Sequence, residues 1–258
     1  MVMKIRILGA HNIESKDTGC TCLLINDVLA LDAGEITSRL SLKAQQKLQA
    51  VLLTHRHYDH VKDLPALGMN FYLTGKTLAI YTIQSVYEDL AHYLLDGTLY
   101  PDFTKRPADK PALKFTIVEP GQEISIGLYR ILAVPVNHAV TCVGYQITSP
   151  EGKKLFYTSD TGPGLADCWP LVSPDMLITE VTVPNKYRDF AIEAGHLTPA
   201  QLQTELEGFR TVKGYLPRVI TLHANPFYQD EIAAELAGVA AVLKINILLG
   251  HEGMRLDL

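Results

Sequence analysis

The chain has 258 residues, of which 47% are hydrophobic and 20% are charged, a balance typical of a globular protein with a sizeable core. A formal net charge of −5 excludes a general electrostatic attraction to nucleic-acid backbones. The N-terminus lacks the pattern of a signal peptide, and no run reaches the roughly 20 apolar residues of a membrane span, so we expect a cytoplasmic protein with no membrane partner.

The predicted elements of the first two thirds are mostly short strands. Apolar runs bounded by turn residues predict strands at Lys4–Gly9, Thr21–Ile25, Val28–Asp32, Ala50–Thr54, Leu78–Thr82, Lys114–Val118, Glu123–Ile126, Tyr129–Val136, Val143–Thr148 and Lys154–Ser159. Asn26-Asp27 predicts a tight turn between the second and third of these. Helices are predicted at Glu35–Leu48 and Gln84–Leu95. The proline-containing stretch Gly97–Pro111 is expected to be a surface loop or lid.

The last third alternates between strands and helices. Strands are predicted at Met176–Thr179, Val219–Leu222 and Ile245–Leu249, and helices at Thr198–Phe209 and Asp230–Leu243. Strand-rich halves, each followed by helices, predict two sheets packed face to face with helices outside. No linker divides the chain, so we expect a single domain over residues 1–258.

The segment from Thr54 to His60 carries the strongest chemical signal. It reads Thr54-His55-Arg56-His57-Tyr58-Asp59-His60 and follows a predicted buried strand. Imidazoles and carboxylates are the ligands that zinc and similar metals prefer. As the backbone leaves the strand, His55 and His57 can face one point while Asp59 and His60 face another nearby. Ligands at this spacing suit two metal ions better than one.

Three later residues at predicted strand ends offer further ligands: His138, Asp160 and His223. Taken alone, each histidine is more often structural, and Asp160 is more often a turn-capping residue. Together with the first motif they predict a metal centre, in which the two oxygens of Asp160 could bridge both ions.

These residues as a set resemble the metallo-β-lactamase superfamily. The resemblance implies an α/β fold, an αββα four-layer sandwich of two mixed β-sheets with helices on the outer faces and metals at one edge. It also implies a division of ligands: one ion bound by His55, His57 and His138, the other by Asp59, His60 and His223, and Asp160 between them. The iron-using branch typically has glutamate in place of His57. The expected cofactors are therefore two divalent ions, zinc first, with manganese or iron as alternatives.

A second set of residues, Glu180 and His196, distinguishes one branch of this superfamily from the others. A phosphodiester hydrolase must protonate its departing alkoxide, and a histidine oriented by a carboxylate does this near neutral pH. The residues alone are equally compatible with a surface glutamate and a histidine beside a helix cap. The phosphodiesterase branch has a glutamate and a His-x-Thr segment in this order. The resemblance therefore implies that Glu180 and His196 are catalytic, and we count Asp59 with them.

Within that branch the chain looks most like the class II cyclic nucleotide phosphodiesterases and their bacterial relatives. The phrases that carry this likeness are Tyr100-Pro101-Asp102-Phe103-Thr104, Val136-Asn137-His138, Thr158-Ser159-Asp160-Thr161-Gly162-Pro163, Pro184-Asn185 and Gly195-His196-Leu197-Thr198-Pro199. Asp63 departs from the family pattern, which usually has glycine there, and its carboxylate is expected to alter the local turn.

Ribonuclease Z is the close competitor, but its members typically have an Arg-Asn pair in the early loop and a long arm that grips tRNA. The segment Glu14–Gly19 lacks that pair, and the 97–111 stretch is short. Transfer RNA is therefore the less favoured partner.

The expected reaction is attack of a metal-bridging hydroxide on a small phosphodiester or cyclic nucleotide, with His196 protonating the leaving oxygen. Thr158 or Ser159 is expected to orient the ligands. Three alternatives stay open: ribonuclease Z-like tRNA processing, thioester or lactone hydrolysis, and a non-catalytic nucleotide sensor that binds metal. A homodimer is possible on the sequence.

Two further histidines and the four cysteines lie outside these motifs. His11 is expected to be a solvated loop residue, although it could reach the metal edge, and His251 could line the cleft. Cys20, Cys22, Cys142 and Cys168 form no Cys-x-x-Cys pair and are expected to be reduced thiols.

Overall fold

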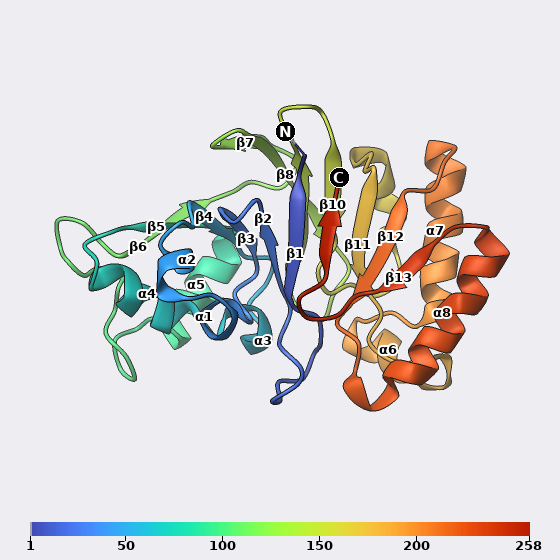
Figure 1. Cartoon of the computed structure of the whole chain (residues 1–258), viewed down its shortest axis with the longest axis horizontal. Coiled ribbons are helices and arrows are strands. Elements are labelled where there is room, and N and C mark those ends of the chain that lie inside the picture. Colours follow the sequence, from blue (N-terminus) through green and yellow to red (C-terminus); the bar gives the residue numbers. More distant parts are fainter. Residues whose placement is uncertain (1) are drawn as a thin grey trace.

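The computed structural model describes residues 2–258, whose strands form two seven-stranded sheets (Figure 1). The first sheet has the order β14-β1-β2-β3-β4-β5-β6, with strands at Arg255–Asp257, Lys4–Gly9, Cys22–Ile25, Leu29–Leu31, Ala50–Leu52, Leu78–Thr82 and Leu113–Ile117. The second has the order β13-β12-β11-β10-β9-β8-β7, with strands at Ile247–Leu249, Arg218–Leu222, Met176–Glu180, Lys154–Tyr157, Cys142–Thr148, Tyr129–Val136 and Glu123–Ile126. Both sheets mix parallel and antiparallel pairs.

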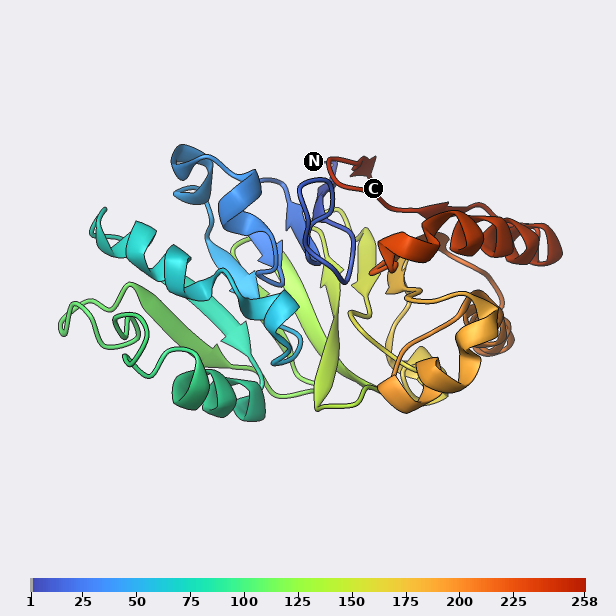
Figure 2. The same ribbon diagram turned by 90° about the horizontal axis from the view of Figure 1, so that it is seen from below.

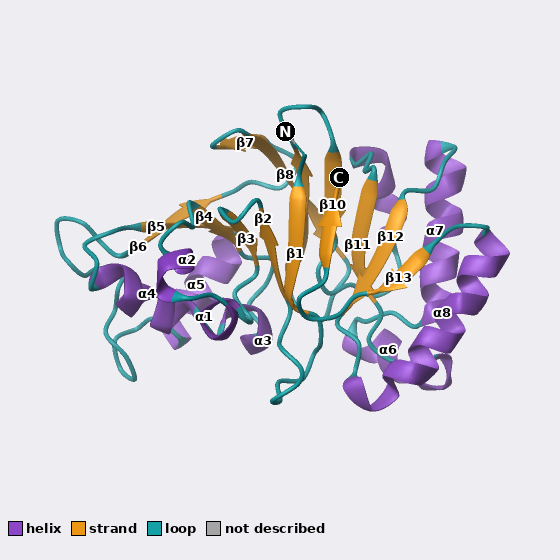
Figure 3. Ribbon diagram, viewed as in Figure 1, coloured by secondary structure: helices purple, strands orange, loops and turns teal. Residues whose placement is uncertain are grey.

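Helices cover the outer faces of both sheets, with the strands between them (Figure 3). The first sheet is flanked by α1 to α5, at Ile36–Arg39, Leu42–Gln45, Tyr58–Val61, Leu64–Tyr72 and Gln84–Tyr93. The second is flanked by α6, α7 and α8, at Arg188–Ala194, Pro199–Lys213 and Gln229–Leu243. Single 3₁₀ turns lie at Leu165–Asp167, Trp169–Leu171, Asn185–Tyr187 and Pro226–Tyr228. The predicted αββα sandwich is confirmed.

Two buried clusters hold these layers together. One contains inner-face residues of both sheets, such as Ile7, Tyr145 and Ile178, and fills the space between them. The other packs the outer face of the second sheet, with Phe156, against α7 and α8, with Leu206 and other apolar side chains. None of the described helices is long and apolar enough to cross a membrane.

The direction of the strands explains why the predicted ligands meet. In the second sheet, β10, β11 and β12 run parallel, and β8 runs in the same direction because both β8 and β10 are antiparallel to β9. Their carboxyl ends therefore share one edge. β4 of the first sheet ends at the same edge and leads into the histidine motif, beside α3 at the bottom of Figure 1. Figure 2 looks onto this edge from below.

Several local features differ from the sequence prediction. The single helix predicted at Glu35–Leu48 is wrong: the chain breaks at the extended Leu40, and the Ser41 hydroxyl accepts a hydrogen bond from Ala44 N to start a second helix. Three helices and one strand were not predicted, namely α3, α4, α6 and β14. The Asn26-Asp27 turn is confirmed, and both residues have positive φ, 47° and 59°, as a tight hairpin turn requires.

Asp63 has an ordinary right-handed helical backbone, with φ of −81° and ψ of −10°, so this position does not require glycine. Its carboxylate accepts a hydrogen bond from Thr37 N at 2.7 Å and lies 3.4 Å from the Lys62 ammonium. The expectation that Asp63 alters the local turn is wrong. Its side chain instead ties the start of α4 to α1.

Candidate metal centre

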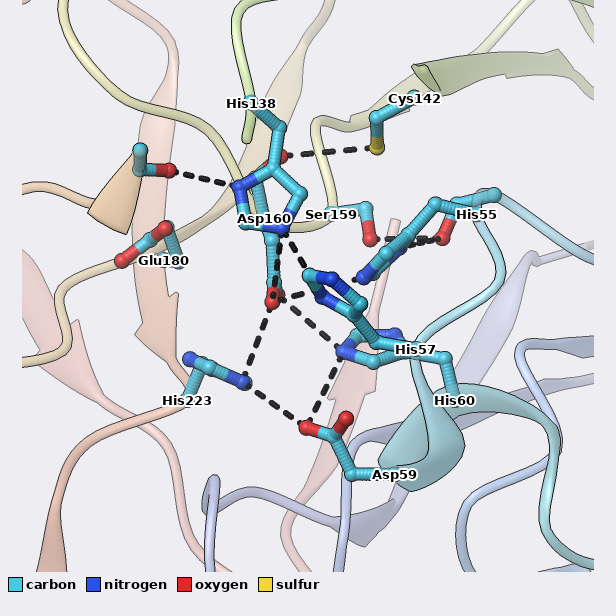
Figure 4. Close-up of polar contacts among 12 residues, drawn as sticks. His55, His57, Asp59, His60, His138, Cys142, Ser159, Asp160, Glu180 and His223 are labelled. Atoms are coloured by element: carbon cyan, nitrogen blue, oxygen red, sulfur yellow. Dashed lines mark hydrogen bonds and ion pairs between the residues drawn. The ribbon is translucent and has the colours of Figure 1, made fainter. Parts of the chain in front are cut away.

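The structure brings all seven predicted ligands together at the shared strand edge, in two groups (Figure 4). In each group the candidate ligand atoms lie within 4.8 Å of one another. The first group consists of His55, His57, His138 and Asp160, and the second of Asp59, His60, Asp160 and His223. Asp160 belongs to both, which is the position expected of a bridging carboxylate.

The distances around Asp160 show how closely the groups converge. Its Oδ2 lies 3.7 Å from His55 Nε2, 3.9 Å from His138 Nε2 and 3.3 Å from His223 Nε2. Its Oδ1 lies 3.3 Å from His60 Nε2. On the other side, Asp59 Oδ2 lies 3.3 Å from His223 Nε2 and 3.5 Å from His60 Nε2.

Four of the imidazoles are oriented by a partner at Nδ1. His60 Nδ1 donates to Asp32 Oδ2 at 2.8 Å, and His138 Nδ1 donates to the Gly195 carbonyl at 2.8 Å. His223 Nδ1 lies 2.8 Å from the Thr182 hydroxyl, which itself donates to Glu180, so the ring must donate. His55 Nδ1 lies 3.0 Å from the Thr54 hydroxyl. Because that hydroxyl donates to Asp32, the His55 ring must donate as well. In the neutral ring such a partner at Nδ1 leaves the lone pair on Nε2, the atom that each of these rings turns toward the other candidate ligands.

Asp32 is the site residue that the sequence analysis missed. It is fully buried, and its carboxylate accepts hydrogen bonds from Thr54 N, the Thr54 hydroxyl, Tyr157 and Ser159 as well as His60. Of the two expected orienting residues, Ser159 joins this network through Thr54 at 2.7 Å, whereas Thr158 bonds to Thr179. A carboxylate directly after the buried run Leu29–Leu31 was the available signal.

Burial and neighbouring charges shift the pKa values within the cluster in different directions. Burial lowers the pKa of His55, His57 and His138, so these rings are neutral near pH 7, the form that binds metals. Burial would also lower the pKa of His60, but Asp160 and Asp32 outweigh it and raise the pKa well above its usual value. Burial opposes ionisation of Asp160, yet His223 and His60 hold its pKa well below the usual range.

Three buried atoms test whether a metal fits these residues. His55 Nε2, His60 Nε2 and Asp160 Oδ1 are buried and have no hydrogen-bond partner. Leaving a buried polar atom unsatisfied costs about 1–3 kcal/mol, and all three belong to the two ligand groups. Nitrogen and carboxylate oxygen are the donors that zinc prefers. The residues present therefore fit a pair of divalent ions.

The backbone at the site is held in an unfavourable conformation. Asp32, Ser159 and His223 have positive φ values of 58°, 59° and 63°, each just after a strand. Non-glycine residues rarely adopt this region, and it is enriched at functional sites. His223 is fixed there by its own N–H, which donates to the Ala10 carbonyl at 2.6 Å.

Glu180 and His196 also meet as predicted from the resemblance. His196 Nδ1 lies 2.7 Å from Glu180 Oε1, and Glu180 also accepts from Thr161 N and Leu197 N. The His196 ring stands next to both ligand groups, with its centroid 5.1 Å from that of His138 and 5.2 Å from that of His223. Burial lowers the pKa of His196, but the charge and hydrogen bond of Glu180 raise it to about 9.

Gly195, next to His196, is required by its surroundings. Its φ is +72°, and an added Cβ would come within 2.6 Å of Ala139 N. This close approach lets the Gly195 carbonyl reach His138, and so it couples the turn that carries His196 to the turn that carries His138.

The sequence also matches a known protein family. Residues 23–223 match the model of a family described as the Beta-lactamase superfamily domain. The chain belongs to this superfamily. The resemblance stated from the sequence is thereby confirmed at the level of family and fold.

Relatives and solved structures of the superfamily agree with this assignment. Ribonuclease Z of Methanopyrus kandleri is 30% identical over 155 residues, which cover 57% of this chain and 50% of that protein. Unliganded yeast PDE1 has a TM-score of 0.85 at 18% identity, over 100% of this chain and 99% of that one. The Bacillus subtilis metallo-beta-lactamase fold protein YhfI has a TM-score of 0.79 at 21% identity, over 100% of both chains. The chain spans about half the length of the curated relatives it matches, and the two structures show likeness of fold alone.

Neither His11 nor His251 belongs to the candidate ligand groups found among the described residues. The expectation that His11 is solvated is wrong: it is 3% exposed, with Nδ1 2.7 Å from Glu252 Oε1 and Nε2 2.8 Å from Gln229 Oε1. His251 is exposed and lies 3.0 Å from the Glu252 carbonyl. The predicted free thiols are present, since all four cysteines are unpaired and buried.

Proposed function

We propose that this chain is a metal-dependent phosphodiester hydrolase that acts on a nucleotide, with a cyclic nucleotide as the first candidate. The observation that carries the proposal is the Glu180–His196 pair, placed beside both ligand groups. Thioester hydrolysis on the same ligands would not need such a pair, because a thiolate leaves without being protonated, whereas the alkoxide of a nucleotide diester does not.

In this proposal the seven ligands hold two divalent ions, zinc first. When bound, such ions neutralise charge on phosphoryl oxygens and lower the pKa of water to near neutrality. The chain's own contribution is orientation and proton transfer. Asp160 and Asp59 supply carboxylates between facing imidazoles, and Asp32 keeps the His60 ring turned toward the cluster.

His196 is the proposed general acid. Glu180 accepts a hydrogen bond from Nδ1–H, and in the protonated ring the other nitrogen carries a second proton that can be given to a leaving oxygen. In the chain without metal, burial lowers the pKa of His196, but the charge and hydrogen bond of Glu180 raise it to about 9. The side chain is 15% exposed, so a bound substrate can reach it from solvent.

The test replaces His196 by alanine in protein loaded with zinc. A nitrophenolate leaves readily without protonation, whereas an alkoxide does not. We expect turnover of a 3′,5′-cyclic nucleotide to fall about 10²–10⁴-fold and turnover of bis(p-nitrophenyl) phosphate to fall far less. Metal content should stay that of the unmodified chain. Full activity of the variant on the cyclic nucleotide would contradict the assignment of the acid, and no activity of the zinc-loaded unmodified chain on either diester would contradict the proposed function.

A second candidate is ribonuclease activity. It is favoured by one finding, that a relative 30% identical over 155 residues is named Ribonuclease Z. Adding a precursor tRNA to the same assay distinguishes the two, because a ribonuclease would cleave the RNA in preference to the cyclic nucleotide.

A further inference from the structure

A pocket with a volume of about 440 Å³ lies beside the ligand loop, between α3 and α5. Its base is apolar, since Val61 and Leu90 are 2% and 3% exposed and Leu94 is half-buried. Its rim carries Tyr58 and Tyr93, which are 69% and 75% exposed. An apolar base below two solvent-exposed aromatic rings is a surface that a flat ring can enter.

Two residues of the pocket wall belong to the ligand loop. Arg56, which lines it, stands between the ligands His55 and His57, and Tyr58 stands between His57 and Asp59. Consecutive Cα atoms are about 3.8 Å apart, so the pocket wall begins one residue from the ligands. A larger pocket of about 800 Å³ beside β6 has no lining residue adjacent in sequence to a ligand.

The charges in the pocket decide which part of a nucleotide it suits. The Arg56 guanidinium lies 2.7 Å from the Asp89 carboxylate of α5, so its charge is already compensated. The pair fixes the ligand loop to α5 and leaves no free cation in the pocket wall for a phosphate. Aromatic side chains, in contrast, stack on any nucleobase.

We propose that this pocket binds the nucleobase of the substrate, stacked on Tyr58 and Tyr93, while the phosphate lies at the ligand cluster. The proposal rests on the proposed function and narrows its substrate class to phosphodiesters that carry a base. Arg56 and Tyr58, the two spacers of the motif, then serve substrate binding while their neighbours serve as ligands.

The test measures binding as well as turnover. Isothermal titration of the full zinc-loaded chain compares adenosine monophosphate with ribose 5-phosphate, which has the phosphate and sugar but no base. For the double variant Tyr58→Ala/Tyr93→Ala we expect the Kd of adenosine monophosphate to rise about 5- to 100-fold and that of ribose 5-phosphate to stay unchanged. The variant Tyr58→Phe/Tyr93→Phe should keep the original affinity, because stacking needs the ring and not the hydroxyl.

Phe227→Ala is the matched control, since Phe227 is an aromatic residue with 82% exposure that lies outside the pocket. We expect it to leave both Kd values unchanged. The inference is overturned if the double alanine variant binds adenosine monophosphate like the unmodified chain, or if Phe227→Ala weakens that binding instead. Zinc-dependent hydrolysis of bis(p-nitrophenyl) phosphate by the unmodified chain is measured in parallel, so that failure of the pocket is distinguished from failure of the proposed function.

Discussion

At the scale of single residues, the orientation of each imidazole depends on the group that holds its other nitrogen. Asp32 serves two of the rings, because its buried carboxylate contacts His60 directly and His55 through Thr54. A carboxylate partner also makes the ring a more basic ligand.

Replacing Asp32 by asparagine should therefore weaken metal binding while keeping the shape of the side chain. We expect zinc affinity to fall about 10–100-fold, measured by competition with a chromophoric chelator. Asp175→Asn, a change at an exposed aspartate directly before β11, is the control and should bind zinc normally. Unchanged zinc affinity in Asp32→Asn would show that the Asp32–His60 bond does not support the ligands.

Glu252 provides a prediction about pH. Burial opposes its ionisation, but His11 and the Gly19 N–H lower its pKa from 4.5 to about 2. Since the folded-state pKa is depressed, the stabilisation is complete above pH 4.5 and is lost as the pH falls toward 2. Glu252→Gln should lower the free energy of unfolding by about 1–2 kcal/mol at pH 7, and by progressively less below pH 4.5.

Urea unfolding of both proteins between pH 7 and pH 3 measures this difference. Glu123→Gln is the control, because Glu123 forms an exposed pair with Arg130 and such pairs contribute little. A Glu252→Gln effect that stays constant with pH would contradict the argument.

At the scale of elements, the start of α7 is defined by a capping box. The Thr198 hydroxyl accepts from Gln201 N, and the Gln201 side chain accepts from Thr198 N. Since His196 lies two residues earlier, this cap also fixes the chain that carries the proposed acid.

Thr198→Ala should lower the free energy of unfolding by about 1 kcal/mol, measured by urea denaturation. Thr204→Ala, on the exposed face of the same helix, should have little effect or stabilise slightly. Equal effects of the two changes would mean that the cap does not contribute.

The elements also show what could be predicted from sequence and why. Long buried strands and the capped helix α7 follow from local pattern, because apolar runs and a Thr-Pro start are visible in sequence. The break between α1 and α2 depends on Ser41 competing for a cap, and the isolated strand β14 forms only by pairing with β1. The convergence of the seven candidate ligands could be predicted because the spacing of the first motif is distinctive and the family resemblance pointed to the other three. For Asp32 the sequence offered only its position directly after a buried run, and for Thr182 it offered no signal, because the roles of both depend on which histidine lies next to them in space.

At the scale of the whole molecule, the fold brings together residues from both sheets at one edge. His55 to His60 follow β4 of the first sheet, whereas His138, Asp160 and His223 follow strands of the second. Metal binding would therefore link the two halves of the sandwich and stabilise the folded chain by an amount that rises with the logarithm of the ratio of free metal to Kd.

The most direct test of the account is the zinc stoichiometry of the metal-free chain, measured by titration against a competing chelator together with elemental analysis. The account predicts two zinc ions per chain, and weakened binding of both in Asp160→Ala, because Asp160 belongs to both ligand groups. Binding of one ion or none by the unmodified chain, or two ions held with unchanged affinity by Asp160→Ala, would contradict it.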